Sequence, residues 1–302
     1  MANDTNFDVI IIGGSYAGLA AAMALGRALR RVLVIDSGKP CNRQTPHSHN
    51  FLTHDGRPPK EIAMLAKEQV AKYNTVQFLD GLATAGAKTA NGFEIKTASN
   101  ESFRAKKLIF ATGIRDLLPD IDGLAACWGI TVIHCPYCHG YEVRHEKTGI
   151  LVNGETAFEA GQHISNWTKD LTIFTNGPST ITPEHTSQLT KHNIKIVEKE
   201  FARLEHTDGY LQNIVFADGT TSFVKAIYAR VSFEQHCTIP ETLGCELTDK
   251  GFLKTDTMFA TTVKGVFACG DNMTGLRSVA NAIASGTTTG IMVNRELILE
   301  EF

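Results

Sequence analysis

Residues 8–25 of the chain read DVIIIGGSYAGLAAAMAL, and this stretch decides the fold. Its apolar run predicts a buried strand over residues 8–13, and the alanine-rich segment that follows predicts a helix over residues 16–29. A second apolar strand is expected over residues 32–35, and it ends at Asp36. The order strand, glycine turn, helix and strand predicts a β-α-β unit at the start of the chain.

The turn between the first strand and the helix matches the dinucleotide-binding fingerprint except at its middle glycine, where Ser15 stands. Gly13 permits the tight turn, and Gly18 lets the helix pack closely on the strand, so the helix N-terminus can bind a pyrophosphate. Asp36 lies where a carboxylate can accept hydrogen bonds from ribose hydroxyls. The motif therefore fits FAD or NAD, and does not fit NADP. A packing turn without a ligand is the alternative.

Two further strand ends favour FAD over NAD. Residues 111–113 read ATG after an apolar strand, and residues 265–275 read GVFACGDNMTG and end another strand with Gly270 and Asp271. Asp271 can accept hydrogen bonds from ribityl hydroxyls, and the helix expected after Ser278 would direct its positive end at the flavin. Each motif alone could be structural, but their order along the chain predicts an FAD site.

A second strand–turn–helix pattern begins at Gly149, and its next strand is expected over residues 171–174. Two similar units, the second inserted into the first, predict an α/β fold of two Rossmann-like three-layer domains. The 302 residues, 43% hydrophobic and 20% charged, are enough for two globular domains. The net charge of −3 gives no sign of nucleic-acid binding. The N-terminus lacks the features of a signal peptide or a membrane span, so we expect a cytoplasmic protein.

One pair among the seven cysteines has a suggestive spacing, in the sequence HCPYCHG of residues 134–140. Cys135 and Cys138 lie three residues apart at an expected helix start, where a disulfide can form and the first thiol has a lowered pKa. Cys135 is therefore expected to exchange with the substrate, and Cys138 to face the flavin. His139, with an ordinary pKa near 6.5, is the preferred proton-transfer residue, and His134 is the competing candidate.

The alternatives for the cysteine pair are a structural zinc site and a pair of inert core cysteines. Zinc needs two more ligands at a matching spacing, and Cys237 and Cys245 do not form a second C-x-x-C. Glutaredoxins also carry C-P-Y-C, but in a small thioredoxin-like domain, whereas this pair follows a complete FAD-type unit. His47, His49 and His54 gather in a loop without fixed ligand geometry, so no metal site is predicted.

With GGSYAG, ATG, C-x-x-C and GVFACGD in the same order and at the same spacing, the chain resembles the low-molecular-weight thioredoxin reductase family along nearly its whole length. The resemblance implies a discontinuous FAD domain, residues 1–116 and 242–302, around an inserted pyridine-nucleotide-like domain, residues 117–241, that carries the cysteines. It also implies a homodimer, and a substrate that is a small dithiol or disulfide or a thioredoxin-like protein.

The resemblance also extends the set of cofactor contacts beyond the motifs. The family segment that matches residues 45–56 runs beside the flavin, which implies contacts there. The cofactor contacts implied by the motifs and by the family are Gly13, Gly14, Ser15, Ala17, Gly18, Asp36, Ser37, Asn42, Arg43, His49, Asn50, Ala111, Thr112, Gly113, Gly270, Asp271, Ser278, Val279 and Ala280.

The sequence departs from the family at the second nucleotide site. The second glycine motif, G-x-G-x-x-A, is here VNGETA over residues 152–157, and its branched valine crowds the tight turn. The next strand continues as TNG over residues 175–177, without the basic cluster that binds the 2′-phosphate of NADPH. His139 replaces an acid after the second cysteine, and SVA over residues 278–280 replaces a flavin-facing Arg-Gln-Ala.

These departures resemble the branch with H-C-P-x-C-H-G-Y-E, which includes the gliotoxin- and holomycin-type dithiol oxidases and reductase-like proteins that take electrons from ferredoxin or another flavin. We therefore predict an FAD-dependent dithiol/disulfide oxidoreductase that uses Cys135 and Cys138 and makes little use of NADPH. An NAD(P)H-dependent thioredoxin reductase with an atypical nucleotide site is the runner-up, and a non-enzymatic flavoprotein redox sensor is the third hypothesis. The substrate, the electron donor or acceptor and the direction of flux stay open.

Overall fold

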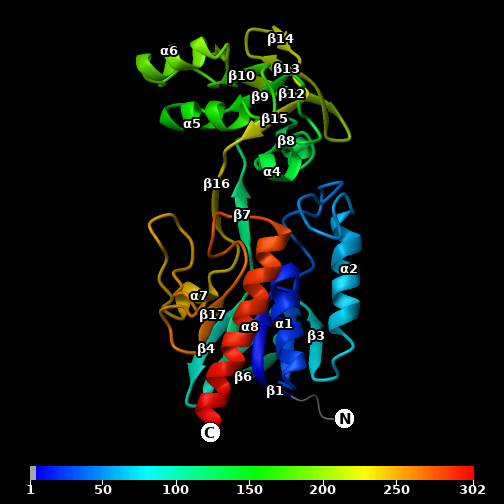
Figure 1. Ribbon diagram of the computed structural model, residues 1–302. Coiled ribbons are helices and arrows are strands. Elements are labelled where there is room, and N and C mark those ends of the chain that lie inside the picture. The colour runs from blue at the N-terminus through cyan, green and yellow to red at the C-terminus, as the bar shows by residue number, and fades with distance from the viewer. Residues whose placement is uncertain (1–4) are drawn as a thin grey trace. The chain divides into compact units, whose positions relative to one another are not determined.

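The computed structural model describes residues 5–302 (Figure 1). The chain forms two compact units. Unit 1 contains the described chain up to Arg43 together with Phe51–Arg115 and Phe233–Phe302, and unit 2 contains Gln44–Asn50 and Asp116–Ser232. None of the helices within residues 5–302 is long and apolar enough to cross a membrane.

The main sheet of unit 1 has the strand order β3-β2-β1-β6-β5-β4, with β17 paired to β6. Strands β3, β2, β1, β6 and β17 are parallel, so their carboxyl ends lie at one edge of the sheet. Strands β4 and β5 extend the sheet in antiparallel pairing. The strands are β1 (Asn6–Ile12), β2 (Val32–Asp36), β3 (Val76–Asp80), β4 (Ala83–Thr89), β5 (Gly92–Thr97), β6 (Ser102–Phe110) and β17 (Val266–Ala268).

The segments of β1, β2, β6 and β17 that lead to this edge are largely apolar, because both faces of the sheet are covered there. Val9 and Ile11 of β1 face a core shared with α1 (Tyr16–Arg27), whereas Ile10 and Ile12 face the core on the other side. Helix α8 (Val279–Glu301) runs alongside α1 (Figure 1). The remaining helices of unit 1 are α2 (Pro59–Val70) and α7 (Ile239–Thr242).

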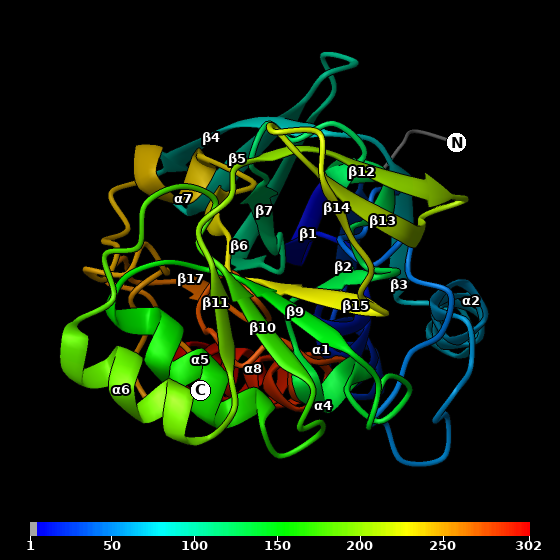
Figure 2. The ribbon, with the colours of Figure 1, turned by 90° about the horizontal axis from the view of Figure 1, so that it is seen from above.

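Unit 2 repeats this layered arrangement around a parallel sheet of order β11-β10-β9-β15-β8. Helices α5 and α6 cover one face of the sheet, and an antiparallel sheet of β12, β13 and β14 covers the other (Figure 2). The elements are α3 (Leu124–Cys127), β8 (Val132–Ile133), α4 (Pro136–His139), β9 (Thr148–Leu151), α5 (Glu155–Ile164), β10 (Leu171–Phe174), α6 (Pro183–Lys191), β11 (Lys195–Val197), β12 (Phe201–Thr207), β13 (Tyr210–Phe216), β14 (Thr221–Ser222) and β15 (Ala226–Ala229).

The predicted fold class, two Rossmann-like three-layer units with one inserted into the other, is confirmed. Besides Asp116, which belongs to unit 2, the borders of the units differ from the expected domain boundaries in two places. Residues 233–241 belong to unit 1, because Ile239 is buried in the apolar core of that unit. Residues 44–50 belong to unit 2, where the side chains of Gln44 and Thr45 pack beside Gly129.

The fold has two further features, an early end of helix α1 and a two-stranded connection between the units. Helix α1 ends at Arg27 rather than at residue 29, because Leu29 has a left-handed φ of 62° that terminates the helix. The chain runs from unit 1 to unit 2 and back through β7 (Ile114–Leu117) and β16 (Ser232–Gln235), which pair as a two-stranded sheet.

Candidate active site

The glycine turn of unit 1 lies at the carboxyl end of β1, beside the chain that leaves β6. Gly13 has a φ of +104°, and a Cβ on it would lie 2.2 Å from the carbonyl oxygen of Ala111. A Cβ on Gly18 would lie 1.8 Å from the carbonyl oxygen of Gly13. Only glycine is compatible with either position. The side chain of Ser15, the N-cap of α1, makes no capping hydrogen bond, so the first N–H groups of the helix can face an anion.

Asp36 lies beside this turn, at the end of β2. The backbone N–H of Gly13 donates to the carbonyl of Ile35 at 2.9 Å, which holds the turn against β2. A Cβ on Gly14 would lie 2.8 Å from the Cβ of Asp36, so the carboxylate-bearing side chain lies directly over the turn. A carboxylate in this position matches the ribose-binding acid of dinucleotide sites.

The ends of β6 and β17 meet at the same edge of the sheet. The N–H of Cys269 donates to the carbonyl of Phe110 at 3.0 Å, and Nδ2 of Asn272 donates to the same carbonyl at 2.7 Å. Asn272 is fully buried, and its Oδ1 has no hydrogen-bond partner within residues 5–302. A buried acceptor of this kind fits a hydroxyl donor of a bound cofactor. Sequence reasoning missed Asn272, although it directly follows the Gly-Asp pair.

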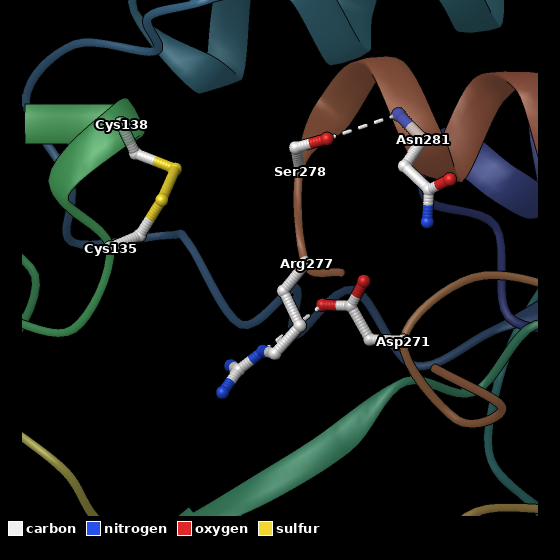
Figure 3. Close-up of a disulfide and its surroundings, with 6 residues drawn as sticks. All are labelled: Cys135, Cys138, Asp271, Arg277, Ser278 and Asn281. Carbon is white, nitrogen blue, oxygen red and sulfur yellow. Dashed lines mark hydrogen bonds and ion pairs between the residues drawn. A yellow bond between two sulfur atoms is a disulfide. The ribbon is translucent and has the colours of Figure 1, made fainter. Parts of the chain in front are cut away.

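Gly270 and Asp271 are held at this edge by the start of α8. The N–H of Gly270 donates to Oγ of Ser285 at 3.1 Å. Nε of Arg277 lies 3.4 Å from Oδ2 of Asp271 (Figure 3). Ser278 caps α8 by accepting a hydrogen bond from the N–H of Asn281 at 3.1 Å, and the first turn of the helix, which begins with Val279 and Ala280, contains no acidic residue. This edge of the sheet therefore carries the positive end of a 23-residue helix.

The other predicted cofactor residues lie in the chain between β2 and α2, and their contacts with FAD stay predictions. His49 and Asn50 belong to unit 2, where Nδ1 of His49 lies 3.7 Å from Oε1 of Glu142. Arg43 is exposed and donates to the carbonyl of Pro40 at 3.3 Å. The exposed Ser37 and the partly buried Asn42 lie with it in the loop after β2. The edge is thus built from the glycine turn, Asp36, residues 111–113 and residues 270–280.

The predicted cysteine pair forms a disulfide in unit 2. Cys135 is the N-cap of the one-turn helix α4, and Cys138 lies within that helix, with a Cα–Cα distance of 5.3 Å. Both cysteines are partly buried. A Cβ on Gly140 would lie 2.4 Å from the carbonyl oxygen of Pro136, so the chain turns tightly after the pair. Within the described part of the chain, no group of three or more His, Cys, Asp or Glu side chains is arranged to hold a metal ion.

The two histidines beside the disulfide have different environments. Burial, reinforced by the electrostatic effect of the nearby His49, lowers the pKa of His139 to about 4. The expectation of an ordinary pKa is therefore wrong, and at neutral pH this imidazole is uncharged. The lowered pKa makes His139 a weaker base than an ordinary imidazole, so it takes up a proton from a thiol less readily. His134 is exposed, and its ring stacks on Trp128 with 5.8 Å between the ring centroids.

Comparison with known proteins gives the class of the molecule. The sequence model of the family "Pyridine nucleotide-disulphide oxidoreductase" matches residues 7–286. Thioredoxin reductase tcpT of Claviceps purpurea is 31% identical, over 99% of this chain and 97% of that protein. The crystal structure of an oxidoreductase from Agrobacterium tumefaciens is 34% identical, with a TM-score of 0.91 over 97% of this chain and 99% of that one. The crystal structure of HlmI is 28% identical, with a TM-score of 0.93 over 100% of this chain and 95% of that one.

The chain therefore belongs to the pyridine nucleotide-disulphide oxidoreductase family. Within that family it is a thioredoxin reductase-like flavoenzyme, which uses FAD and acts on disulfides. The resemblance, the cofactor and the enzyme class predicted from the sequence are confirmed. The edge of unit 1 fits FAD, because its glycines leave no room for side chains and its polar groups match a dinucleotide.

The glycine turn gives a direct test of the FAD site. In Gly13→Val a branched side chain would clash with the Ala111 carbonyl at a φ that favours glycine, so the purified variant should contain no FAD. Gly81→Val is the matched control, since a Cβ there approaches nothing closer than 3.9 Å. The measurement is the ratio of flavin to protein absorbance. Full FAD occupancy in Gly13→Val would contradict the assignment.

The pKa of His139 predicts a pH dependence of stability. The unfolded chain takes up a proton on His139 below pH 6.5, whereas the folded protein does so only near pH 4. Stability should therefore fall as the pH is lowered through this window, by about 3 kcal/mol from this residue between pH 7 and pH 4. His139→Asn should remove that part of the acid destabilisation in denaturant unfolding. The exposed His134→Asn should keep it, and equal pH profiles for wild type and His139→Asn would contradict the lowered pKa.

Proposed function

We propose that the enzyme passes electrons between FAD and a dithiol substrate through Cys135 and Cys138, without efficient use of NADPH. The observation that carries the second part of this proposal is the hydrogen bonding of Asn153 in unit 2. The family and the disulfide support the first part.

Asn153 lies in the turn between β9 and α5, where a dinucleotide unit binds a pyrophosphate. Its Oδ1 accepts hydrogen bonds from the N–H groups of Gly154 at 2.8 Å and Thr180 at 2.9 Å. Its Nδ2 donates to the carbonyl of Pro178 at 2.9 Å. The side chain thus ties the turn to the loop after β10 and occupies N–H groups that would otherwise be available to a phosphate. Glu155, in the first turn of α5, adds a negative charge at the same helix end.

The surface after β10 is also unsuited to the 2′-phosphate of NADPH. A hollow of about 350 Å³ lies there. It contains the carboxylates of Glu198 and Glu200, and Nζ of Lys199 already pairs with Oδ2 of Asp218 at 2.8 Å. The residues lining the hollow are Gly177, Pro178, Glu198, Lys199, Glu200, Ala217 and Asp218. A phosphate binds well to arginine or lysine, so this excess of carboxylates supports weak NADPH binding.

The disulfide can exchange with a dithiol in two steps. One substrate thiolate attacks Sγ of Cys135, which forms a mixed disulfide and releases Cys138 as a thiolate. The second substrate thiolate attacks the substrate sulfur of that mixed disulfide, which releases the substrate disulfide and the Cys135 thiolate. His139, beside the pair, is the proposed acceptor of the proton of the substrate thiol, and its lowered pKa makes it a weaker base than an ordinary imidazole. FAD, when bound, supplies the two-electron acceptor. The reverse sequence reduces a disulfide.

The relatives and the cysteine signature support the proposed substrate class. Relatives named thioredoxin reductase support a thioredoxin-like partner, and the H-C-P-Y-C-H-G-Y-E signature supports a small dithiol or disulfide. The homodimer and the cytoplasmic location are part of the proposal as expectations from the family resemblance and the sequence.

Anaerobic titration tests the absence of NADPH use. Losing even one charge-assisted phosphate contact costs about 1.5–3 kcal/mol, so NADPH should reduce the flavin at least about tenfold less efficiently than in an NADPH-dependent thioredoxin reductase. A dithiol such as dithiothreitol should bleach the same sample. Asn153→Ala frees two backbone donors and should tighten NADPH binding by about fivefold, since a hydrogen bond contributes about 1 kcal/mol. Rapid stoichiometric bleaching of the wild type by micromolar NADPH would instead favour an NAD(P)H-dependent thioredoxin reductase.

The unequal roles of the two cysteines are testable by absorbance. Cys135→Ser should leave Cys138 as a thiolate next to oxidised flavin and give a long-wavelength charge-transfer band. Cys138→Ser should lack the band, and both variants should lose turnover because each removes half of the redox pair. Cys41→Ser, at an exposed cysteine outside the disulfide, is the control and should retain both turnover and the wild-type spectrum. A band in Cys138→Ser and none in Cys135→Ser would reverse the two roles.

A further inference from the structure

Arg277, which the sequence motifs do not single out, forms an ion pair with a predicted cofactor residue. Its Nε lies 3.4 Å from Oδ2 of Asp271, and each of the two side chains is only 15% exposed (Figure 3). Removing one partner of a largely buried pair takes a favourable interaction away from the charge that is left, which is unfavourable. Arg277 is therefore expected to stabilise the charged form of Asp271.

The backbone holds Arg277 in a fixed position before α8. Its N–H donates to the carbonyl of Gly275 at 3.0 Å. Nδ2 of Asn281 donates to the carbonyl of the preceding residue, Leu276, at 2.8 Å, and the N–H of Asn281 donates to Oγ of the following residue, Ser278, at 3.1 Å. Hydrogen bonds on both sides of Arg277 therefore present its guanidinium to Asp271 from a tethered segment.

The edge of unit 1 brings several negative charges together when FAD is bound. Asp36 and Asp271 each contribute a carboxylate, and the pyrophosphate of FAD contributes two further negative charges. Like charges in a partly buried site repel more strongly than in water. The positive helix ends of α1 and α8 offset part of this repulsion, and Arg277 cancels the charge of one carboxylate directly.

We propose that Arg277 is a positioning residue of the FAD site, which acts through Asp271 by holding its carboxylate in place and cancelling its charge. This inference rests on the assignment of this edge as the FAD site. The net charge of the pair is zero in the wild type, −1 without Arg277 and +1 without the Asp271 carboxylate. Because a reduced flavin carries more negative charge than an oxidised one, the reduction potential should follow that net charge.

The decisive experiment measures the midpoint potential of the bound flavin in four proteins, the wild type, Arg277→Met, Asp271→Asn and the double variant. Arg277→Met should lower the potential and Asp271→Asn should raise it. Each change is expected to be about tenfold in the equilibrium constant, or roughly 30 mV for a two-electron couple. The double variant should return close to the wild-type potential. Loss of packing alone would not produce shifts of opposite sign, so unchanged potentials, or shifts of the same sign, would overturn the proposal.

FAD affinity gives a second readout that needs no turnover. Arg277→Met should weaken FAD binding to the apoprotein by about tenfold, measured by flavin fluorescence. Adding Asp271→Asn should recover at least part of that loss, because it removes the negative charge that Arg277 balances in the wild type. Arg277→Lys should stay within a few-fold of the wild type, since it keeps the charge. If the double variant binds FAD more weakly than Arg277→Met, Arg277 acts independently of Asp271 and the proposal is wrong.

Control variants separate this proposal from the cofactor-site assignment. Arg295→Met makes the same charge change at an exposed position of α8 and should leave potential and affinity unchanged. If Asp271→Asn matches the wild type in both measurements, the placement of FAD at this edge is wrong. If Asp271→Asn changes the potential and the affinity and Arg277→Met does not, FAD lies at this edge but Arg277 is not a positioning residue. If Arg277→Met does not fold, Arg277→Lys and the double variant still decide between these outcomes.

Discussion

The closest backbone contacts of unit 1 surround the turn between β1 and α1. A Cβ on Gly18 would reach the Gly13 carbonyl at 1.8 Å, and a Cβ on Gly286 of α8 would reach the Ala17 carbonyl at 2.1 Å. Helix α1 therefore packs closely on the end of β1 on one side and on α8 on the other. This packing brings the N-termini of both helices to the edge where β1, β2, β6 and β17 end. The placement of the pyrophosphate and ribityl sites depends on these glycine contacts.

The sequence predicted most of this edge because backbone geometry restricts residue type so strongly there. Gly13 and Gly18 tolerate no side chain, and Asp36 stands at a strand end that periodicity alone locates. The cysteine pair could also be predicted, because a disulfide between residues three apart in the sequence depends on local structure alone. Residues whose role depends on packing could not be predicted in this way. The ordinary pKa expected for His139 was wrong, because its burial and its neighbour His49 come from the fold rather than from local sequence.

Residues that act through partners far along the chain also escaped sequence reasoning. Asn272 acts through the carbonyl of Phe110, 162 residues away, and no periodic pattern or motif marks such a pair. The assignment of residues 44–50 to the compact unit that carries the cysteines also escaped sequence reasoning. The side-chain contacts of this segment, such as those of Gln44 and Thr45 beside Gly129, decide where it packs, and its position in the sequence does not show them.

The two units share a topology, but the backbone N–H groups at their glycine turns are hydrogen bonded differently. The N-terminus of a helix leaves several N–H groups without intrahelical partners, and burying them unpaired is costly. In unit 1 the side chain of Ser15 leaves them open to a ligand. In unit 2 the carboxamide of Asn153 bonds the turn of α5 and the loop after β10. Under the proposed function this turn makes little use of NADPH, and Asn153 satisfies its donors within the protein, since unpaired buried N–H groups would destabilise it. Asn153 thereby supports the stability of the unit that carries the disulfide.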